Sequence, residues 1–89
     1  MKNLKDTISL MISDDYKERF KAEYQQTKIR YEKLKDFCNR IEAANTALGI
    51  EEPNHDCPFW LLRRQQTQMG EYLHTLELRA LIEEVDLEM

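Results

Sequence analysis

The chain has 89 residues, a formal net charge of −4 and a sequence pI of about 5.2. Its length supports one domain with a modest core. The acidic balance argues against general nucleic-acid binding, and the apolar N-terminal run is too short and too charged to cross a membrane.

Residues 1–12 form an N-terminal arm or short helix, ahead of a helical hairpin domain that we place at residues 13–89. Asn3 or Asp6 can cap a short helix here. The apolar residues of this segment are Leu4, Ile8, Leu10, Met11 and Ile12. Two arrangements remain open: a short helix that folds back on the hairpin, or an arm that packs on a neighbouring subunit.

A long helix is predicted from about residue 14 to about residue 47. Ser13, Asp14 and Asp15 precede Tyr16, and their oxygens suit the exposed amides at a helix start. Gly49 suits the left-handed conformation that ends a helix. Alternating steps of four and three place one set of residues on the same side of this helix. We call them the first stripe: Phe20, Tyr24, Thr27, Tyr31, Leu34, Cys38 and Ile41.

Residues 50–56 are predicted to connect this helix to a second one, from about residue 58 to about residue 85. Pro58 suits the first turn, with Asp56 or Cys57 as the cap. The same spacing defines the second stripe: Phe59, Leu62, Gln66, Met69, Leu73, Leu76 and Ala80. Gly70 lies inside this helix, where glycine costs about 1 kcal/mol relative to alanine. It either allows another backbone to approach closely or is simply tolerated.

Two stripes joined by one short connection predict an all-α fold, an antiparallel two-helix hairpin with a short N-terminal element. Such a core is small for a stable domain, so we expect a homo-oligomer. The expected contact is an apolar cluster outside the second stripe: Leu78, Leu81, Ile82 and Val85. The alternative is that residues 1–12 cover this cluster within the same chain.

The residues that could carry chemistry predict no enzyme, no metal and no cofactor. Cys57, His55 and His74 lack the spacing of a zinc site. Cys38 lies on the first stripe, so it is expected to be buried and inert. A disulfide between Cys38 and Cys57 is conceivable, but no signal-peptide pattern is present and we expect both thiols to be reduced.

Charge is unevenly distributed along the chain. Between residues 16 and 41 there are eight Lys or Arg against four acids, whereas residues 71–89 contain six acids and one arginine. Attraction between the two parts favours antiparallel contact, and it also leaves room for a local basic pocket. The alternative is that these charges only solvate the helix faces.

Aromatic, cationic and amide side chains lie together off the stripes. This combination suits a nucleotide, because a ring stacks on a base, a guanidinium binds phosphate and an amide reads a base edge. The predicted ligand-binding residues are Arg30, Arg63, Arg64, Gln65, Gln68, Tyr72 and Arg79. Packing explains Tyr24 and Tyr31 better, because both lie on the first stripe.

A longer pattern runs from Arg-Tyr-Glu-x-Leu through a Cys-Pro loop end to Leu-Glu-x-Arg-Ala. It comprises Arg30, Tyr31, Glu32, Leu34, Cys57, Pro58, Leu61, Leu62, Gln65, Met69, Tyr72, Leu73, Leu76, Glu77, Arg79 and Ala80. On these residues the chain resembles small proteins of tailed bacteriophages and prophages, a family related to a protein of a crAss-like phage. The resemblance covers about residues 13–84 and implies phage origin, the host bacterial cytoplasm and no catalytic role.

The expected fold is also similar to phage anti-defence sponges, small acidic hairpins that capture cyclic-nucleotide immune signals between subunits. This similarity implies a counter-defence protein that sequesters a nucleotide-derived host signal without catalysis. Its partners would be a second copy and a small phosphorylated nucleotide. The alternative is a protein-binding inhibitor or adaptor that blocks a host defence nuclease or complex. A structural accessory of phage replication or assembly is a third hypothesis.

Overall fold

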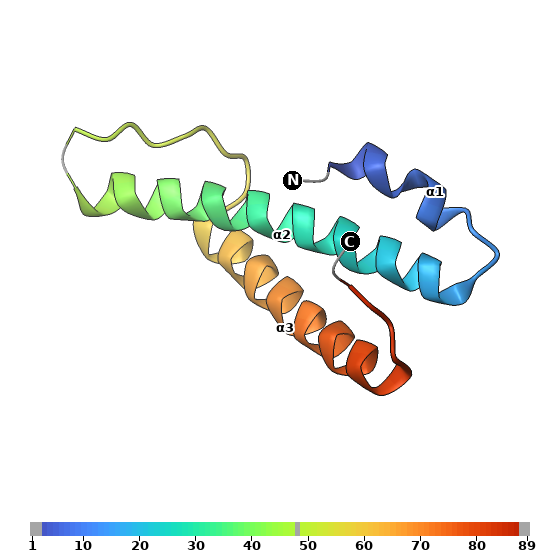
Figure 1. Cartoon of the computed structure of the whole chain (residues 1–89). Coiled ribbons are helices and arrows are strands. Elements are labelled where there is room, and N and C mark those ends of the chain that lie inside the picture. Colours follow the sequence, from blue (N-terminus) through green and yellow to red (C-terminus); the bar gives the residue numbers. More distant parts are fainter. Residues whose placement is uncertain (1–2, 48, 88–89) are drawn as a thin grey trace.

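The computed structural model describes residues 3–47 and 49–87. A short 3-10 helix, η1 (Leu4–Thr7), leads into α1 (Ile8–Met11), α2 (Tyr16–Thr46) and α3 (Phe59–Glu83). The two long helices pack antiparallel, and α1 and α3 lie on opposite sides of α2 in Figure 1. Every element in the described residues is helical, and none of these helices has both the length and the hydropathy that crossing a bilayer requires.

The two stripes form the interface between α2 and α3, as predicted. The core cluster between them consists of Phe20, Tyr24, Leu73, Leu76, Ala80 and Val85. Cys38 and Ile41 are fully buried farther along α2. The remaining members of both stripes are half-buried. The 4-3 spacing therefore identified the contact face of each helix.

A second face of α2 is also buried, which the sequence analysis did not predict. Ala22 and Ile29 are 1% and 4% exposed and lie on the same side as Gln26. The Gln26 Nε2 donates to Thr7 Oγ1 at 2.9 Å, and that hydroxyl donates to the Leu4 carbonyl at 2.7 Å. Residues 4–11 thus fold back on α2, the first of the two arrangements considered for this segment.

The starts of the two long helices differ in how they are capped. The Asp15 carboxylate accepts the amide of Lys17 at 2.9 Å and caps α2, within the predicted acidic cluster. The N-cap of α3 is Pro58, which has no side chain able to accept a bond. The predicted cap by Asp56 or Cys57 is wrong, because Pro58 is still extended (ψ 143°) and the helix begins one residue later.

The helix ends also differ from the prediction. Helix α2 ends at Thr46, and Gly49 has the expected left-handed φ of 85° but lies beyond the helix. At the end of α3 the left-handed residue is Glu84, with φ 58°, and the Val85 amide donates to the Ala80 carbonyl at 2.9 Å. This turn sends the chain back towards α2, and Val85 enters the core at 7% exposure.

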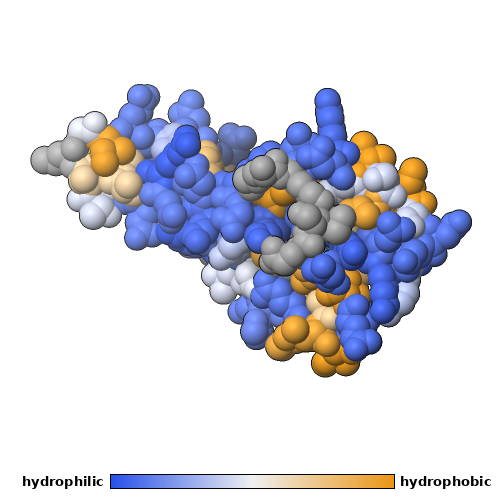
Figure 2. All heavy atoms as spheres, viewed as in Figure 1, coloured by the Kyte–Doolittle hydropathy of each residue, from blue (hydrophilic) through white to orange (hydrophobic). Residues whose placement is uncertain are grey.

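The predicted subunit contact is therefore smaller than expected. Val85 is buried in its own chain and is not available to a partner, which corrects that part of the prediction. Leu78, Leu81 and Ile82 are 48%, 80% and 81% exposed, because residues 4–11 lie against α2 instead. Figure 2 shows hydrophobic atoms at the C-terminal end of α3, on a largely hydrophilic face.

Candidate functional site

The predicted ligand-binding residues lie on different sides of the hairpin. Gln65, Tyr72 and Arg79 follow at steps of seven on α3 and share one side of that helix. Arg64 and Gln68 belong to this same exposed side, because Arg64, Gln68 and Tyr72 follow at steps of four. Within the described part of the chain, none of the seven predicted residues lines any of the cavities described below.

Arg63 ties the two long helices together. Its Nη2 donates to Glu42 Oε1 at 2.5 Å and to Asn39 Oδ1 at 3.1 Å, both on α2. Its Nη1 donates to Gln66 on the next turn of α3. The guanidinium lies 5.5 Å from the centre of the Phe59 ring. Arg63 is half-buried and ion-paired, so it does not face the same ligand as its exposed neighbour Arg64.

Arg79 is also engaged within the chain. Its guanidinium donates to both carboxylate oxygens of Glu83, at 2.8 and 3.3 Å, and lies 4.7 Å from the centre of the Phe20 ring. These hydrogen bonds lower the pKa of Glu83 and raise that of Arg79. By contrast, Arg30 and Arg64 are exposed, and neither forms an ion pair with any residue that the structure describes.

A groove that the sequence analysis missed runs between α2 and α3. Two cavities, of about 200 and 650 Å³, lie along it and share Tyr31 and Gly70. We call this pair the tyrosine groove. The smaller cavity is lined by Tyr24, Lys28, Tyr31, Glu32, Gly70, Leu73 and Glu77. The larger is lined by Tyr31, Gln66, Thr67, Gly70, Glu71, His74 and Thr75.

Gly70 allows Tyr31 to lie against the backbone of α3. A Cβ at position 70 would stand 3.3 Å from Tyr31 Cε1, which is tighter than ordinary contact, and 3.6 Å from its hydroxyl oxygen, an ordinary van der Waals distance. The close approach expected at this glycine is therefore made by a side chain, not by a second backbone. Two features of the sequence could have indicated the groove: a glycine inside one predicted helix and a tyrosine on the facing stripe.

Charged groups line the tyrosine groove unevenly. Three carboxylates line it, those of Glu32, Glu71 and Glu77, and Glu77 accepts a hydrogen bond from the Tyr24 hydroxyl at 2.7 Å. Lys28 lines the smaller cavity together with Glu32 and Glu77, and its Nζ lies 5.8 Å from the centre of the Tyr24 ring. A third cavity, of about 370 Å³, continues from Tyr24 and Glu77 to the C-terminal segment.

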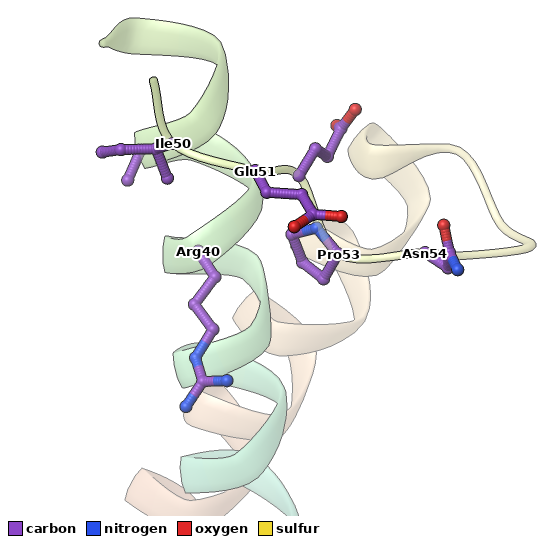
Figure 3. A pocket seen from close by; sticks show the side chains of 7 residues that line it. Arg40, Ile50, Glu51, Pro53 and Asn54 are labelled. Carbon is purple, nitrogen blue, oxygen red and sulfur yellow. The ribbon is translucent and has the colours of Figure 1, made fainter. Parts of the chain in front are cut away.

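A separate cavity of about 380 Å³ lies between the end of α2 and the connecting loop. Figure 3 shows Arg40 on α2 beside the loop residues Ile50, Glu51, Pro53 and Asn54, with its side chain extending along α2 away from the loop. Arg40 is ion-paired with Asp36 one turn earlier, at 2.9 Å. Because Arg40 is already ion-paired and the loop contributes acidic side chains, this cavity is poorly suited to an anionic ligand.

His55 makes hydrogen bonds within the loop and contacts α2 through the ring of Phe37. Its Nδ1 lies 2.6 Å from the Cys57 carbonyl oxygen, and its Nε2 lies 3.4 Å from Glu52 Oε1. Its ring meets the edge of Phe37 with centroids 6.4 Å apart. These hydrogen bonds raise the pKa of His55, with the Cys57 carbonyl contributing most.

The cysteines are free, and burial raises the pKa of the Cys38 thiol. Cys57 is exposed at the end of the loop. Among the described residues, no three His, Cys, Asp or Glu side chains lie close enough together to hold a metal ion. The tyrosine groove is thus the arrangement in which aromatic, hydroxyl and charged side chains of both long helices meet.

The fold and groove define a class of protein, the small helical hairpin with an open polar groove between its helices. The family model described as Sequestin matches residues 14–82, and the chain belongs to the Sequestin family. No curated protein matches the chain, and neither does any solved structure.

Membership in this family establishes the broad function. Sequestin proteins are phage anti-defence proteins that sequester a host immune signal molecule, and they bind the signal without catalysis. The prediction of a non-enzymatic counter-defence protein is confirmed at this level. The family assignment favours it over the protein-binding inhibitor and the structural accessory.

Proposed function

We propose that the captured signal is a small phosphorylated nucleotide, held unchanged at a site shared between two copies of the chain in the host bacterial cytoplasm. Family membership is the observation that carries this proposal, since it supplies signal capture without chemistry. The chemical class of the signal, the site shared between two copies and the binding residues named below go beyond what family membership gives.

Arg30 and Arg64 are the best candidates for phosphate contacts. Both are exposed and make no ion pair with the described residues, so binding an anion breaks no existing pair. A guanidinium can bind phosphate through two parallel hydrogen bonds. Arg63 and Arg79 would have to leave Glu42 and Glu83 before doing the same.

Tyr72 can supply a ring to the same ligand. It is 42% exposed on α3 and shares a side of that helix with Gln65, whose amide can reach a base edge. Gln68 lies on the outer side with Arg64. These residues share the exposed side of α3, and in this proposal a second copy closes the site around the ligand from the other side.

The exposed apolar cluster supports association of two copies. Leu81 and Ile82 are four-fifths exposed, and Leu78 is half exposed beside them. Removing apolar surface from water contributes about 25 cal/mol per Å², and the entropy lost on association offsets part of this gain. Ile8, Met11 and Ile12 of the N-terminal segment are also exposed, but this segment lies on the opposite side of α2 from α3.

Thermal unfolding in the presence of candidate signals tests the function. Cyclic dinucleotides, cyclic trinucleotides and ADP-ribose derivatives are added to the purified protein one at a time. A ligand at 100 times its Kd adds about 2.7 kcal/mol to the free energy of unfolding. The chain is acidic, so binding depends on local cations and should weaken as salt is added. If none binds at tens of micromolar, or if the bound ligand is recovered hydrolysed, the proposal is wrong.

Charge-matched variants test the phosphate contacts. The double variant Arg30→Ala/Arg64→Ala should lose the ligand-induced shift but keep its helicity and oligomer size. Lys33→Ala/Lys35→Ala removes two exposed positive charges elsewhere on α2 and should keep the shift. Equal loss in both doubles would mean that net charge matters and that the two arginines do not contact the ligand.

A further inference from the structure

We infer that the tyrosine groove binds the nucleoside part of a nucleotide, with the Tyr31 ring as its stacking surface. This inference deepens the proposed function and rests on it for the class of ligand. It adds a binding site for the uncharged part of that ligand. Arg30 and Arg64, named above for the phosphates, do not line the groove.

The position of Tyr31 carries the inference. The ring is half-buried, borders a cavity on each side and packs against the core cluster. Its Cε1 and hydroxyl oxygen lie within 3.3–3.6 Å of the Cβ position that Gly70 lacks, so the bare backbone of α3 supports the ring. A ring held in place loses little freedom when a base stacks on it, and every base offers a face for stacking.

The size and polarity of the groove suit a nucleoside. Its larger cavity, about 650 Å³, lies within the range of about 300–1,000 Å³ found for small-molecule sites. Carboxylates accept hydrogen bonds from hydroxyl and amino groups, which ribose and the amino-substituted bases provide. Glu32 and Glu71 line the groove beside Tyr31 and can accept such bonds.

The charges direct a phosphate out of the groove. Glu32, Glu71 and Glu77 repel an anion, and Lys28 lines the same smaller cavity as Glu32 and Glu77. Gln66 lines the larger cavity and accepts a hydrogen bond from Arg63, which is already paired with Glu42. A nucleotide would therefore place its base and sugar in the groove and its phosphate outside it.

The two glycines of the chain provide a direct probe of occupancy. Gly70 lies in the tyrosine groove, whereas Gly49 lies in the distant loop with nothing within 4 Å of its Cβ position. Titration of ¹⁵N-labelled protein with adenosine, which carries no phosphate, should shift the Gly70 amide signal in an NMR spectrum. The Gly49 signal should stay in place and serves as the internal control.

Variants of Tyr31 separate stacking from other effects. Tyr31→Phe keeps the ring and should bind adenosine about as well as the wild type does. Tyr31→Leu removes the ring and should weaken binding by about 5- to 100-fold, the range expected for loss of one stacked base. Gly70→Ala should also weaken binding, because its methyl group pushes the ring out of place.

The outcomes distinguish the groove from the broader proposal. The groove assignment is overturned if adenosine up to about 10 mM leaves Gly70 unmoved, or if Tyr31→Leu binds like the wild type. If phosphorylated signals still raise the unfolding temperature in that case, the proposed function stands without this groove. If adenosine binds but no phosphorylated signal does, the groove stands and the proposed ligand class is wrong.

Discussion

The two cysteines show how burial changes the chemistry of one residue type. Cys38 is fully buried between the long helices, and this burial raises the pKa of its thiol. Cys57 is exposed where the loop meets α3. The thiolate is the reactive form, so a raised pKa and a lack of access both protect Cys38.

Thiol labelling should therefore distinguish them. In the native protein at pH 8, Ellman's reagent should modify Cys57 quickly and Cys38 only after denaturant is added. A Cys57→Ser variant should show no fast reaction. Two equally fast thiols in the wild type would contradict the burial of Cys38.

The pKa of His55 predicts that the stability of the folded loop depends on pH. Its pKa is raised from 6.5, chiefly by the hydrogen bond with the Cys57 carbonyl and then by Glu52. Folding therefore favours the protonated ring. The resulting stabilisation is fully present below about pH 6.5 and is lost as the pH rises through the folded-state pKa.

The matched variant is His55→Asn, whose amide can donate a hydrogen bond but does not titrate. The difference in unfolding temperature between wild type and variant should shrink between pH 6 and pH 8.5. A difference that is independent of pH would mean that His55 does not bind the loop in its charged form.

At the scale of single elements, α3 has a glycine in its interior and a non-glycine residue at its left-handed end. Gly70 costs helix stability, but it leaves space for Tyr31. Glu84 has φ 58°, a conformation that costs most L-residues about 1 kcal/mol or more. Helix stability alone would favour the opposite choice at each position, a non-glycine residue inside the helix and a glycine at its left-handed end.

Gly70→Ala should stabilise the protein by up to about 1 kcal/mol, because alanine is the better helix former. Tyr31 has a cavity on each side into which it can shift by a few tenths of an ångström. Urea unfolding measures the change. A loss of stability would show that Tyr31 is held too firmly to move.

Glu84→Gly should raise the free energy of unfolding by about 0.5–1 kcal/mol, because glycine adopts the left-handed conformation without strain. Glu84→Ala is the control, since it removes the same charge and keeps the strain. Equal gains in both variants would assign the effect to charge at the helix end.

At the scale of the whole molecule, the hairpin leaves apolar side chains of α3 in water. The described chain extends about 50 × 25 × 20 Å, so a large share of each helix faces solvent. Such a thin molecule gains from a partner that covers its exposed apolar cluster.

Light scattering coupled to size-exclusion chromatography should show an oligomer of the wild type at micromolar concentration. Leu81→Asp/Ile82→Asp should dissociate it with little loss of helicity, because both side chains are four-fifths exposed within the chain. Ile50→Asp, in the exposed loop, is the control and should leave the oligomer intact. A wild-type monomer would contradict the shared site.

The sequence by itself determined the two long helices and their contact faces. These features depend on local spacing, because steps of four and three place side chains on one side of any α-helix. Phe20, Cys38 and Leu76 could therefore be assigned to the core before the structure was known. The function class came from the similarity of the expected fold to phage anti-defence sponges, and family membership confirms it.

Only the tertiary structure decided which residues of the two helices lie opposite each other. This pairing of residues across the two helices depends on the loop and on the angle at which the helices cross, and neither stripe alone specifies these. It placed Tyr31 over Gly70 and formed a groove from a tyrosine that the sequence assigned to packing and a glycine that was expected either to allow a close approach or to be tolerated. The same packing also brings Arg63 of α3 next to Glu42 of α2, an ion pair that no local sequence spacing predicts.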